Sequence, residues 1–380
     1  MKYYFIVNPG SRTGKARELW NEMHKRLERS GRDFEVFYTK NQGDAQKAAC
    51  SICRKDPAMK RIVVVGGDGT LNEAVNGIPV GAKVMLGVIP TGSSNDFARG
   101  VGIASDPMKA FERILNPRYF EKIDVGITRF PVKHTLIPRG EVQEAKVGAE
   151  EAREVQEAKA GAGEAREVQE AKVGAGEARE VQEAKAGAEE AREVQEAKVG
   201  AEETRKKEAR FAVSSSIGYD AQICHKALES RLKKFLNRIG KGRLVYYITG
   251  IFFVFKCPHV KAEIIIDGKR KLSYKKLVFA SAMNTRYEGG GMPMGPDADP
   301  SDGKVTMCIV HDVSRLKHLF YMPSVIKANH VNKKGVEQIT CRTCEVRTEK
   351  PLCVHTDGEP AGIRDHVIFS CTGEKLKVMR

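Results

Sequence analysis

The sequence lacks a hydrophobic run long enough to cross a membrane. Its longest apolar stretch, residues 244–255, contains Thr249 and Gly250, whereas a transmembrane helix needs about 20 apolar residues. We expect a buried helix here, with a helix at a membrane interface as the alternative. No secretory signal is visible either, because Met1 and Lys2 lead into a short apolar run that ends at a turn. A cytoplasmic protein is therefore expected.

Cysteine and tryptophan are also sparse, with nine and one residues among 380. So few cysteines in so long a chain exclude a disulfide framework. Two CxxC pairs are present, Cys50/Cys53 and Cys341/Cys344. A zinc site would need both pairs to converge from opposite ends of the chain. We therefore expect reduced thiols rather than zinc ligands.

Acidic residues are scarce outside one segment. The whole chain has a formal charge of +15, but residues 141–205 hold 18 Glu against ten Lys and Arg. The remaining residues therefore have a net charge of +23. A body this basic favours an anionic partner.

The acidic segment is a tandem repeat of five 13-residue copies, beginning EVQEAKVGAEEAR at Glu141 and ending at Arg205. A 13-residue shift rotates a helical side chain by about 220°, so the valines form no apolar stripe. Every copy also contains glycine, which disfavours a helix interior. We interpret the repeat as a solvated insert, partly helical or disordered, that contributes to no core.

The chain on either side of the insert has two different patterns. Before it, strands alternate with amphipathic helices, which predicts a doubly wound parallel sheet. The expected strands are 2–7, 34–38, 61–65 and 84–89, and the expected helices are 15–30, 43–55 and 70–76. After the insert, apolar and polar residues alternate as in antiparallel strands. Those strands are expected at 211–217, 260–266, 276–282, 305–310, 336–339 and 367–371, with turns at Asp267-Gly268 and Asp302-Gly303.

The segment RIVVVGGDGTLNEAVNG, residues 61–77, is the most informative motif. A buried strand leads into Gly66, Gly67 and Gly69, whose backbone N–H groups can approach phosphate oxygens at the N-terminus of the next helix. Asp68 stands between them, where a nucleotide and Mg²⁺ are expected. The motif predicts a nucleotide site at the carboxyl edge of the sheet.

Two similar loops follow other strands, NPGSRTGK at 8–15 and PTGSSNDFAR at 90–99. Together the three loops predict a phosphate cradle. The first loop is not a Walker A motif, because Gly10 and Gly14 are one residue too close and Ala16 replaces the Ser or Thr that holds Mg²⁺. A P-loop NTPase is therefore excluded.

These motifs resemble the bacterial diacylglycerol kinase-like lipid kinases, which share a catalytic domain with sphingosine and ceramide kinases. The GGDG signature is similar, more distantly, to NAD kinase and phosphofructokinase. The matching pieces are NPGSRTGKA (8–16), GGDGTLNEAVNG (66–77), PTGSSNDFARG (90–100), IDVG (123–126), SIGYDAQI (216–223), MNTRYEGGGMPMGPDADPSDGKVTM (283–307) and HTDGEPAG (355–362).

The resemblance implies an α/β + β fold, with a doubly wound NAD kinase/phosphofructokinase-like nucleotide domain and a C-terminal antiparallel β-sandwich-type domain. The boundaries expected are 1–125 for the ATP-binding domain and 126–370 for the β-rich domain, with residues 371–380 packing back on the first. The repeat falls where the family has a short connection, so it should leave from the end of a hairpin.

The resemblance also implies the catalytic roles. Asp357 is the first candidate for the base, facing the GGDG loop, with Glu359 assisting it. The competing interpretation of Asp357 is a hairpin corner, since Asp-Gly is common there. Asp68 is the rival base, or else it organises Mg²⁺–ATP through water.

The remaining site residues are implied in two groups. The nucleotide site should comprise Asn8, Thr39, Gly66, Gly67, Asp68, Gly69, Thr70, Gly92, Ser93, Ser94 and Asn95. Magnesium ligands should include Asp96, Asp124 and Asp302, for each of which a surface-turn carboxylate is the alternative. The expected cofactors are ATP and Mg²⁺.

The function implied is ATP- and Mg²⁺-dependent phosphorylation of diacylglycerol to phosphatidic acid. The alternatives are another lipid alcohol (a sphingoid base, ceramide, phosphatidylglycerol or undecaprenol), NAD, or no catalysis. The expected partner is an anionic membrane at its inner face, met by the basic residues of 231–243, for which a solvated helix face is the alternative. The loop 289–292 and the segment 244–255 should border the acceptor cleft, with core packing as the alternative for the latter. Nucleic acid is not expected as a partner, and a homodimer is compatible with the sequence.

Overall fold

The computed structural model describes residues 2–11, 15–55, 58–131, 208–229 and 244–380. Its N-terminal part is a parallel sheet in the strand order β2-β1-β3-β4. The strands are β1 (Tyr3–Val7), β2 (Phe34–Tyr38), β3 (Lys60–Gly66) and β4 (Val84–Pro90). The helices are α1 (Lys15–Arg29), α2 (Asp44–Lys55), α3 (Asp68–Gly77), the short α4 (Asp96–Gly100) and α5 (Pro107–Leu115).

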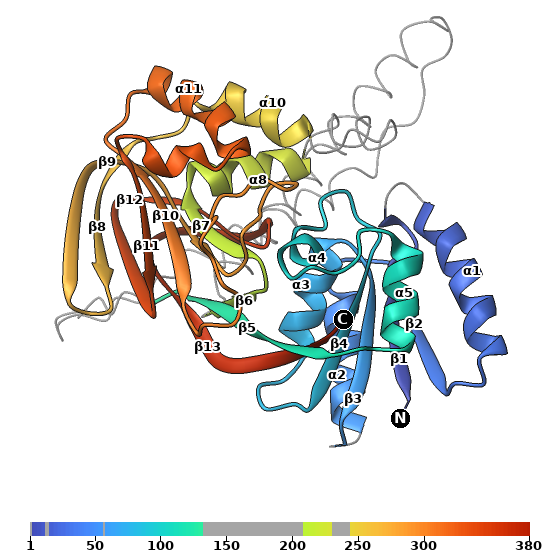
Figure 1. Ribbon diagram of the computed structural model, residues 1–380. Coiled ribbons are helices and arrows are strands. Elements are labelled where there is room, and N and C mark those ends of the chain that lie inside the picture. The colour runs from blue at the N-terminus through green and yellow to red at the C-terminus, as the bar shows by residue number, and fades with distance from the viewer. Residues whose placement is uncertain (1, 12–14, 56–57, 132–207, 230–243) are drawn as a thin grey trace, which may run out of the picture. The chain divides into compact units, whose positions relative to one another are not determined.

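Alternation of side chains along the buried strands explains why helices cover both faces of this sheet (Figure 1). Ile62 and Val64 of β3 pack with residues of α2 and α3 on one face. Val63 and Val65 pack with residues of α1 and α5 on the other. Because a strand buried on both faces has no polar side, its sequence is apolar throughout. The doubly wound arrangement is thereby confirmed.

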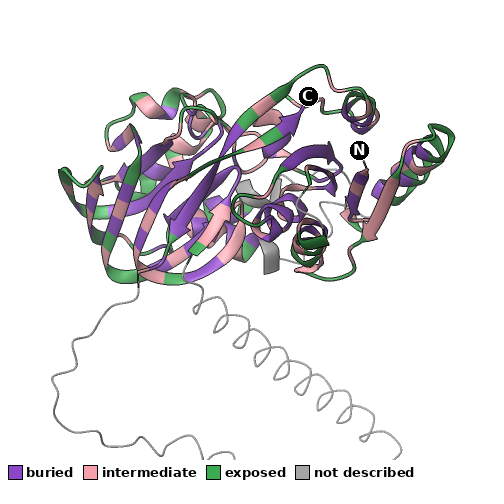
Figure 2. Ribbon diagram, turned by 90° about the horizontal axis from the view of Figure 1, so that it is seen from below, coloured by how far each residue is buried: buried purple, intermediate pink, exposed green. Residues whose placement is uncertain are grey.

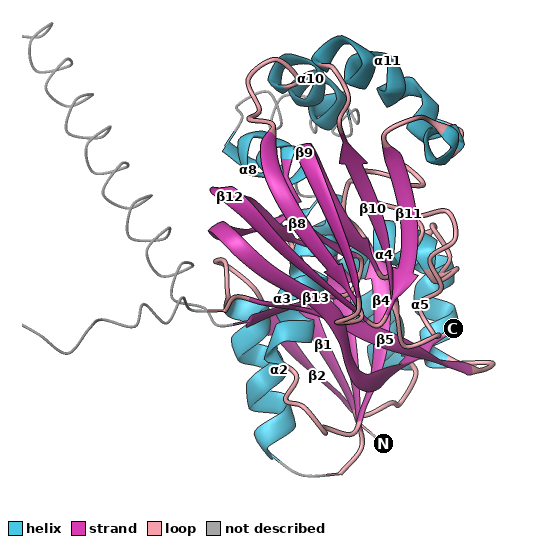
Figure 3. Cartoon of the chain, turned by 90° about the vertical axis from the view of Figure 1, so that its left-hand side faces the viewer, coloured by secondary structure: helices cyan, strands magenta, loops and turns pink. Residues whose placement is uncertain are grey.

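The C-terminal part is built from antiparallel strands around a second apolar core (Figure 3). Its strands are β5 (Phe120–Arg129), β6 (Glu208–Phe211), β7 (Ser214–Gly218), β8 (Val260–Ile266), β9 (Arg270–Met283), β10 (Val305–His311), β11 (Val336–Cys341), β12 (Thr343–Thr356) and β13 (Glu359–Met379). The turn predicted at Asp267-Gly268 joins β8 to β9, and both residues have positive φ, 51° and 66°. In Figure 2 the strands of this part are buried along much of their length.

Strand β13 links the two parts of the molecule. It pairs with β12 and β5, and near its end Lys377 and Val378 pair in parallel with Met85 and Leu86 of β4. The C-terminal residues therefore extend the nucleotide-domain sheet. The predicted boundary near residue 125 falls inside β5, so strands continue across it.

The 13-residue repeat lies outside the described residues, but the strands that flank it are described. Strands β5 and β6 pair antiparallel, with Gly126 opposite Phe211 and Arg129 opposite Glu208. The long connection between them therefore leaves from the end of a two-strand ladder, as the sequence predicts. The described residues belong to one compact unit.

Three helices lie at one end of the antiparallel part (Figures 1 and 3). They are α8 (Tyr219–Glu229), α10 (Leu244–Phe253) and α11 (Arg315–Ile326). The prediction that α10 is buried is wrong, because the side chains of Ile248, Ile251 and Phe252 are exposed. Within the part of the chain that the structure describes, no helix combines the length and apolarity needed to span a bilayer.

Candidate active site

The backbones of the glycine-rich loops after β3 and β4 are in direct contact. The Thr91 N–H donates to the Gly66 carbonyl at 2.9 Å, and a Cβ added to Gly92 would lie only 2.5 Å from the Cα of Gly67. No side chain fits between them, so this contact requires glycine. No side-chain hydrogen bond caps the N-terminus of α3, so its first backbone N–H groups can meet a phosphate.

The loop after β1 joins the same cluster through side chains. Asn8 Nδ2 donates to Thr70 Oγ1 at 3.0 Å, and the hydroxyls of Ser11 and Thr91 are 2.7 Å apart. The three predicted loops therefore meet at one edge of the sheet. Residues 12–14 of the first loop lie outside the described residues.

Two carboxylates face each other beside these loops. Asp68 accepts hydrogen bonds from the backbone N–H groups of Asp96 and Phe97, at 3.1 and 3.2 Å. Asp96 accepts from Gly290 N–H at 2.7 Å and from Arg99 at 3.1 Å. Burial raises the pKa of both groups, and repulsion from Asp68 helps to raise the pKa of Asp96 to about 7. A cation at this position would remove that repulsion.

Asp357 forms the hairpin corner that was the alternative interpretation of its sequence, and it also lines the cleft. It has φ 51° and, with Gly358 at φ 82°, forms the corner between β12 and β13. Its carboxylate also lines the cleft. The four hydrogen bonds that it accepts come from the N–H groups of Ala212, Val213 and Ser214 and from Asn72 Nδ2.

These four bonds give Asp357 a structural role in addition to any catalytic one. They hold the segment between β6 and β7, and α3 through Asn72, against the hairpin corner. Burial raises the pKa of Asp357 to about 6, although the same hydrogen bonds oppose that rise. The assignment of Asp357 as base stays a prediction.

Glu359 reaches the glycine loop from the opposite side of the cleft. A Cβ added to Gly69 would lie 2.6 Å from Glu359 Oε1, so glycine at this position allows the carboxylate to come close. The sequence separates these two residues by 290 positions, and the fold brings them into contact. Asp68, Asp357 and Glu359 therefore share one cleft, where each can contribute to proton transfer or charge balance.

Most of the predicted site residues line this cleft or support its loops. Those that line it are Gly67, Asp68, Gly69, Ser93, Ser94, Asp96, Asp357 and Glu359. Gly66, Thr70, Gly92, Asn95 and Asn8 lie directly behind them in the loops. Thr39 lies at the end of β2, where its hydroxyl donates to the Val7 carbonyl at 3.4 Å.

Asp124 and Asp302 lie in a separate cluster. Asp124 accepts the Gly303 N–H at 2.6 Å and pairs with Lys375 Nζ at 3.2 Å. Asp302 accepts the Lys304 N–H at 2.9 Å. Neither residue is among those lining the cleft. Asp68 and Asp96 fit a cation at the cleft better, because both line it.

A buried histidine connects the cleft wall to the Asp357 corner. His355 Nε2 lies 3.1 Å from carboxylate oxygens of both Asp220 and Glu288. On its other side, His355 Nδ1 accepts the Gly358 N–H at 3.1 Å. Burial alone would lower the pKa of His355, and hydrogen bonds to Asp220 and Glu288 raise it. The Gly358 N–H at Nδ1 opposes that rise, because it requires the ring to carry its proton on Nε2 alone. No role was predicted for these three residues, because they are too far apart in the chain for their spacing to show that they are in contact.

Two of these residues, with Cys224, form a cluster that does not fit a metal ion. Asp220, Cys224 and His355 place potential ligand atoms within 4.8 Å of one another. A metal-bound histidine, however, normally donates its second ring N–H to an acceptor. Here His355 Nδ1 faces a donor, the Gly358 N–H. This cluster is therefore better described as a hydrogen-bonded support for the corner. All nine cysteines are free of disulfides, as expected.

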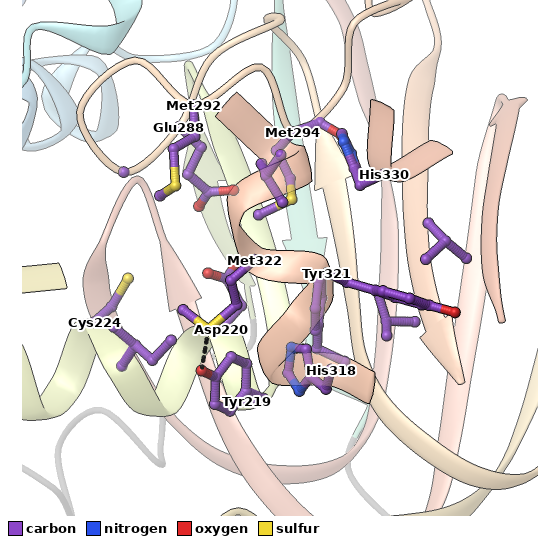
Figure 4. Close-up of a pocket in the computed structure, with 16 residues that line it drawn as sticks. Tyr219, Asp220, Cys224, Glu288, Met292, Met294, His318, Tyr321, Met322 and His330 are labelled. Atoms are coloured by element: carbon purple, nitrogen blue, oxygen red, sulfur yellow. Dashed lines mark hydrogen bonds between the residues drawn. The ribbon is translucent and has the colours of Figure 1, made fainter. Parts of the chain in front are cut away.

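An apolar cavity adjoins the polar cleft (Figure 4). Its volume accessible to a water-sized molecule is about 90 Å³, enough for part of an apolar tail. The walls come from α8, β9, the loop after β9, β10 and α11, with Phe279, Met294, Met322 and Val325 among the lining residues. Cys224, Glu288 and Gly289 line both this cavity and the cleft. A molecule with an apolar tail and a polar head could therefore occupy both.

A phosphate cradle, clustered carboxylates and an adjoining apolar cavity define a phosphotransferase site suited to a lipid acceptor. Comparisons agree with this class. Residues 2–127 match the diacylglycerol kinase catalytic domain, and residues 213–380 match the YegS C-terminal NAD kinase beta sandwich-like domain. The chain therefore belongs to the diacylglycerol kinase-like lipid kinase family.

Individual relatives show how far the similarity extends. The diacylglycerol kinase of Bacillus subtilis strain 168 is 23% identical over 363 residues, which cover 94% of this chain and 89% of the relative. The diacylglycerol kinase of Staphylococcus carnosus strain TM300 is 35% identical over 122 residues, which cover 32% of this chain and 39% of the relative. A crystal structure of a diacylglycerol kinase from Bacillus anthracis strain Sterne covers 100% of this chain and 96% of its own, with TM-score 0.57 and 17% identity. That structure supports the fold alone.

Proposed function

We propose that this protein transfers the terminal phosphoryl group of ATP to the free hydroxyl of diacylglycerol, giving phosphatidic acid. The observation that carries the proposal is the shared wall of the two cavities. Glu288 and Gly289 line both the polar cleft beside the glycine loops and the apolar cavity. An acceptor whose tail fills the cavity would present its hydroxyl to the cleft.

The donor side follows from the loops. Phosphates of ATP would lie over Gly67 and Gly69, where backbone N–H groups at the start of α3 can donate to them. Ser93 and Ser94 of the second loop line the same cleft. We assign the phosphate contacts to these loops, and the proton acceptor to one of Asp357, Asp68 and Glu359.

Magnesium is part of the proposal because the carboxylates fit it. Asp68 and Asp96 supply oxygen ligands of the kind that Mg²⁺ prefers, and their mutual repulsion leaves a place for positive charge. When bound with ATP, Mg²⁺ would neutralise charge on the transferring phosphoryl group. Asp68 and Asp96 would hold it, while Arg99 and the Gly290 N–H keep Asp96 oriented.

A second acceptor class is favoured by one observation. The wall between the cavities is acidic, with Glu288 and Asp220 both beside His355. Carboxylates accept hydrogen bonds, so an acceptor with additional hydroxyl or amine donors, such as a sphingoid base, would also suit this wall. A headgroup that carries phosphate, as in phosphatidylglycerol, would be repelled by it.

Transfer of labelled γ-phosphate tests the proposal. The full chain would be incubated with Mg²⁺, labelled ATP and, separately, dioleoylglycerol, sphingosine, ceramide, phosphatidylglycerol and NAD. We expect labelled phosphatidic acid as the main product. Label on sphingosine instead would retain the lipid kinase and change the acceptor. Label on NAD alone, or on none of the five, would refute the proposal.

A further inference from the structure

Exposed apolar side chains gather on the two helices above the apolar cavity. Twelve large hydrophobic residues are exposed in the described part of the chain, and seven belong to α10, α11 or the turns after them. We call these seven the cap face: Ile248, Ile251, Phe252, Phe255, Leu316, Phe320 and Ile326. A monomer surface rarely concentrates so much apolar area without a partner.

The spacing on α10 makes one continuous stripe. Ile248, Ile251, Phe252 and Phe255 follow the i, i+3, i+4, i+7 rule, so they share one side of the helix and its final turn. All four are between 46% and 58% exposed. A soluble helix usually turns such a stripe inward, whereas here it faces outward.

The two helices contact each other on their other sides. A Cβ on Gly250 of α10 would lie 2.7 Å from Met322 Cε of α11, and Figures 1 and 3 show both helices at the same end of the molecule. On α11, Phe320 is 77% exposed, while Tyr321, Met322 and Val325 line the apolar cavity. One helix therefore separates the cap face from the proposed acceptor site.

The chain segments that carry the cap face are basic. Residues 244–262 and 313–336 contain no Asp or Glu, and they contain Lys256, Lys261, Arg315, Lys317, Lys327, Lys333 and Lys334. Lys256 Nζ lies 4.4 Å from the centre of the Phe252 ring, so a cation accompanies an exposed aromatic side chain. Basic residues next to apolar ones suit a surface that is apolar below an anionic layer.

We propose that the cap face docks on the surface of an anionic lipid bilayer, with the side chains of α10 and α11 inserted among the headgroups. The inference rests on the proposed function, since it places the acceptor cavity directly behind the docked helix α11. A second copy of this chain fits less well, because a symmetric contact would bring the lysines of both copies together. Neither helix is long enough to cross the bilayer, so docking is interfacial.

Vesicle flotation of the full chain, without ATP, tests docking separately from catalysis. The probes are phosphatidylcholine vesicles and vesicles of phosphatidylcholine mixed with phosphatidylglycerol. We expect wild type to float with the mixed vesicles and to bind the neutral vesicles more weakly. The variant Phe252→Glu/Phe320→Glu should lose at least about tenfold in partition coefficient on the mixed vesicles, because two aromatic side chains no longer insert.

A matched control is Val80→Glu, which changes another exposed apolar residue, 63% accessible, in the loop before β4. It should float like wild type. The pair Lys317→Gln/Lys327→Gln should weaken binding to the mixed vesicles by about fivefold per charge while leaving binding to neutral vesicles unchanged. Because these lysines support no packing described above, this pair tests docking even if the glutamate variant unfolds.

The outcomes separate docking from function. Wild type that fails to float, or glutamate and glutamine variants that float like wild type, would overturn the proposal. So would loss of a dimer in the glutamate variant by sedimentation, which would make the cap face an interface between copies. Turnover of dispersed dioctanoylglycerol without flotation would leave the kinase standing and docking refuted. Flotation without labelling of any lipid alcohol would support docking and refute the proposed kinase activity.

Discussion

The polar cleft and the apolar cavity share a wall but are encoded in different ways. Residues of the cleft come from loops at strand ends, and several are adjacent in sequence, as in Gly67-Asp68-Gly69. The cavity is lined by residues spaced along α8 and α11, by the loop after β9, and by residues of β9, β10 and β11. Motifs therefore identify the phosphoryl-transfer chemistry. Of the acceptor border expected from the sequence, the loop 289–292 lines the cavity through Gly289 and Met292, whereas no described side chain of the segment 244–255 does.

The largest effect should come from the cleft. Asp68→Asn should lower the turnover number by about a thousandfold, because the cleft loses a charge beside the phosphates. Phosphoryl transfer from labelled ATP to dioleoylglycerol measures this. Asp106→Asn is the matched control, since Asp106 also accepts a backbone N–H at a helix start, from Lys109 at 2.8 Å. Unchanged turnover in Asp68→Asn would show that the Asp68 carboxylate has no role in catalysis.

Asp357→Ala should lower turnover at least about a hundredfold and also destabilise the fold. Three backbone N–H groups lose their acceptor, at a cost of about 1–3 kcal/mol for each one left unsatisfied. Urea unfolding and turnover would be measured together.

The control for Asp357 is another Asp-Gly corner. Asp267 has the same φ, 51°, and accepts the N–H groups of Arg342 and Thr343. Asp267→Ala should destabilise the protein without changing turnover. If Asp357→Ala also loses only stability, Asp357 is a structural corner and the base is Asp68 or Glu359.

An intermediate effect is expected from filling the apolar cavity. Val325→Trp adds bulk to its wall and should raise the KM for dioleoylglycerol by about tenfold, because part of the tail loses its place. The KM for ATP should stay unchanged, since Val325 does not line the cleft. Equal changes in the KM for dioleoylglycerol and the KM for ATP would mean that the cleft and the apolar cavity do not bind the two substrates separately.

The smallest effect concerns the pH dependence of stability. The pKa of Asp96 is raised to about 7 by burial and by Asp68, above its ordinary value near 4. The folded state therefore binds this proton more tightly than the unfolded state, and stability falls as pH rises from about 4 to 7. Asp96→Asn should be more stable than wild type by about 1 kcal/mol at pH 8, with no advantage at pH 4. An equal difference at both pH values would contradict this reasoning.

Local patterns predicted the nucleotide domain well. Strand β3 was expected at 61–65 and is Lys60–Gly66. A short apolar run that ends at a glycine-rich loop is typical of a buried strand, so this prediction needed no tertiary information. Strand β13 was expected only at 367–371 but runs from Glu359 to Met379. Its remaining residues are polar or mixed, and pairing with β12, β5 and β4 makes them a strand. Tertiary contact supplied what local sequence lacked.

For the site as well, residues in local motifs were predicted, whereas those that depend on contacts between distant segments were not. Asp68 and Asp96 lie in loops whose sequence motifs were recognised, and the fold brings them together. Glu288 and His355 stand in motifs as well, yet their roles depend on a contact across 67 positions of sequence. The apolar run of α10 predicted burial, but the fold leaves its stripe exposed. Apolarity alone did not distinguish a buried helix from one with an exposed apolar face.

A crystal structure with a non-hydrolysable ATP analogue and dioctanoylglycerol would test most directly whether the two cavities serve one reaction. We expect the phosphates over Gly67 and Gly69, an acyl chain beside Phe279 and Met322, and the free hydroxyl between Glu288 and Asp68. A lipid bound elsewhere while the analogue fills the cleft would contradict the shared site. So would an apolar cavity that remains closed to the acyl chain.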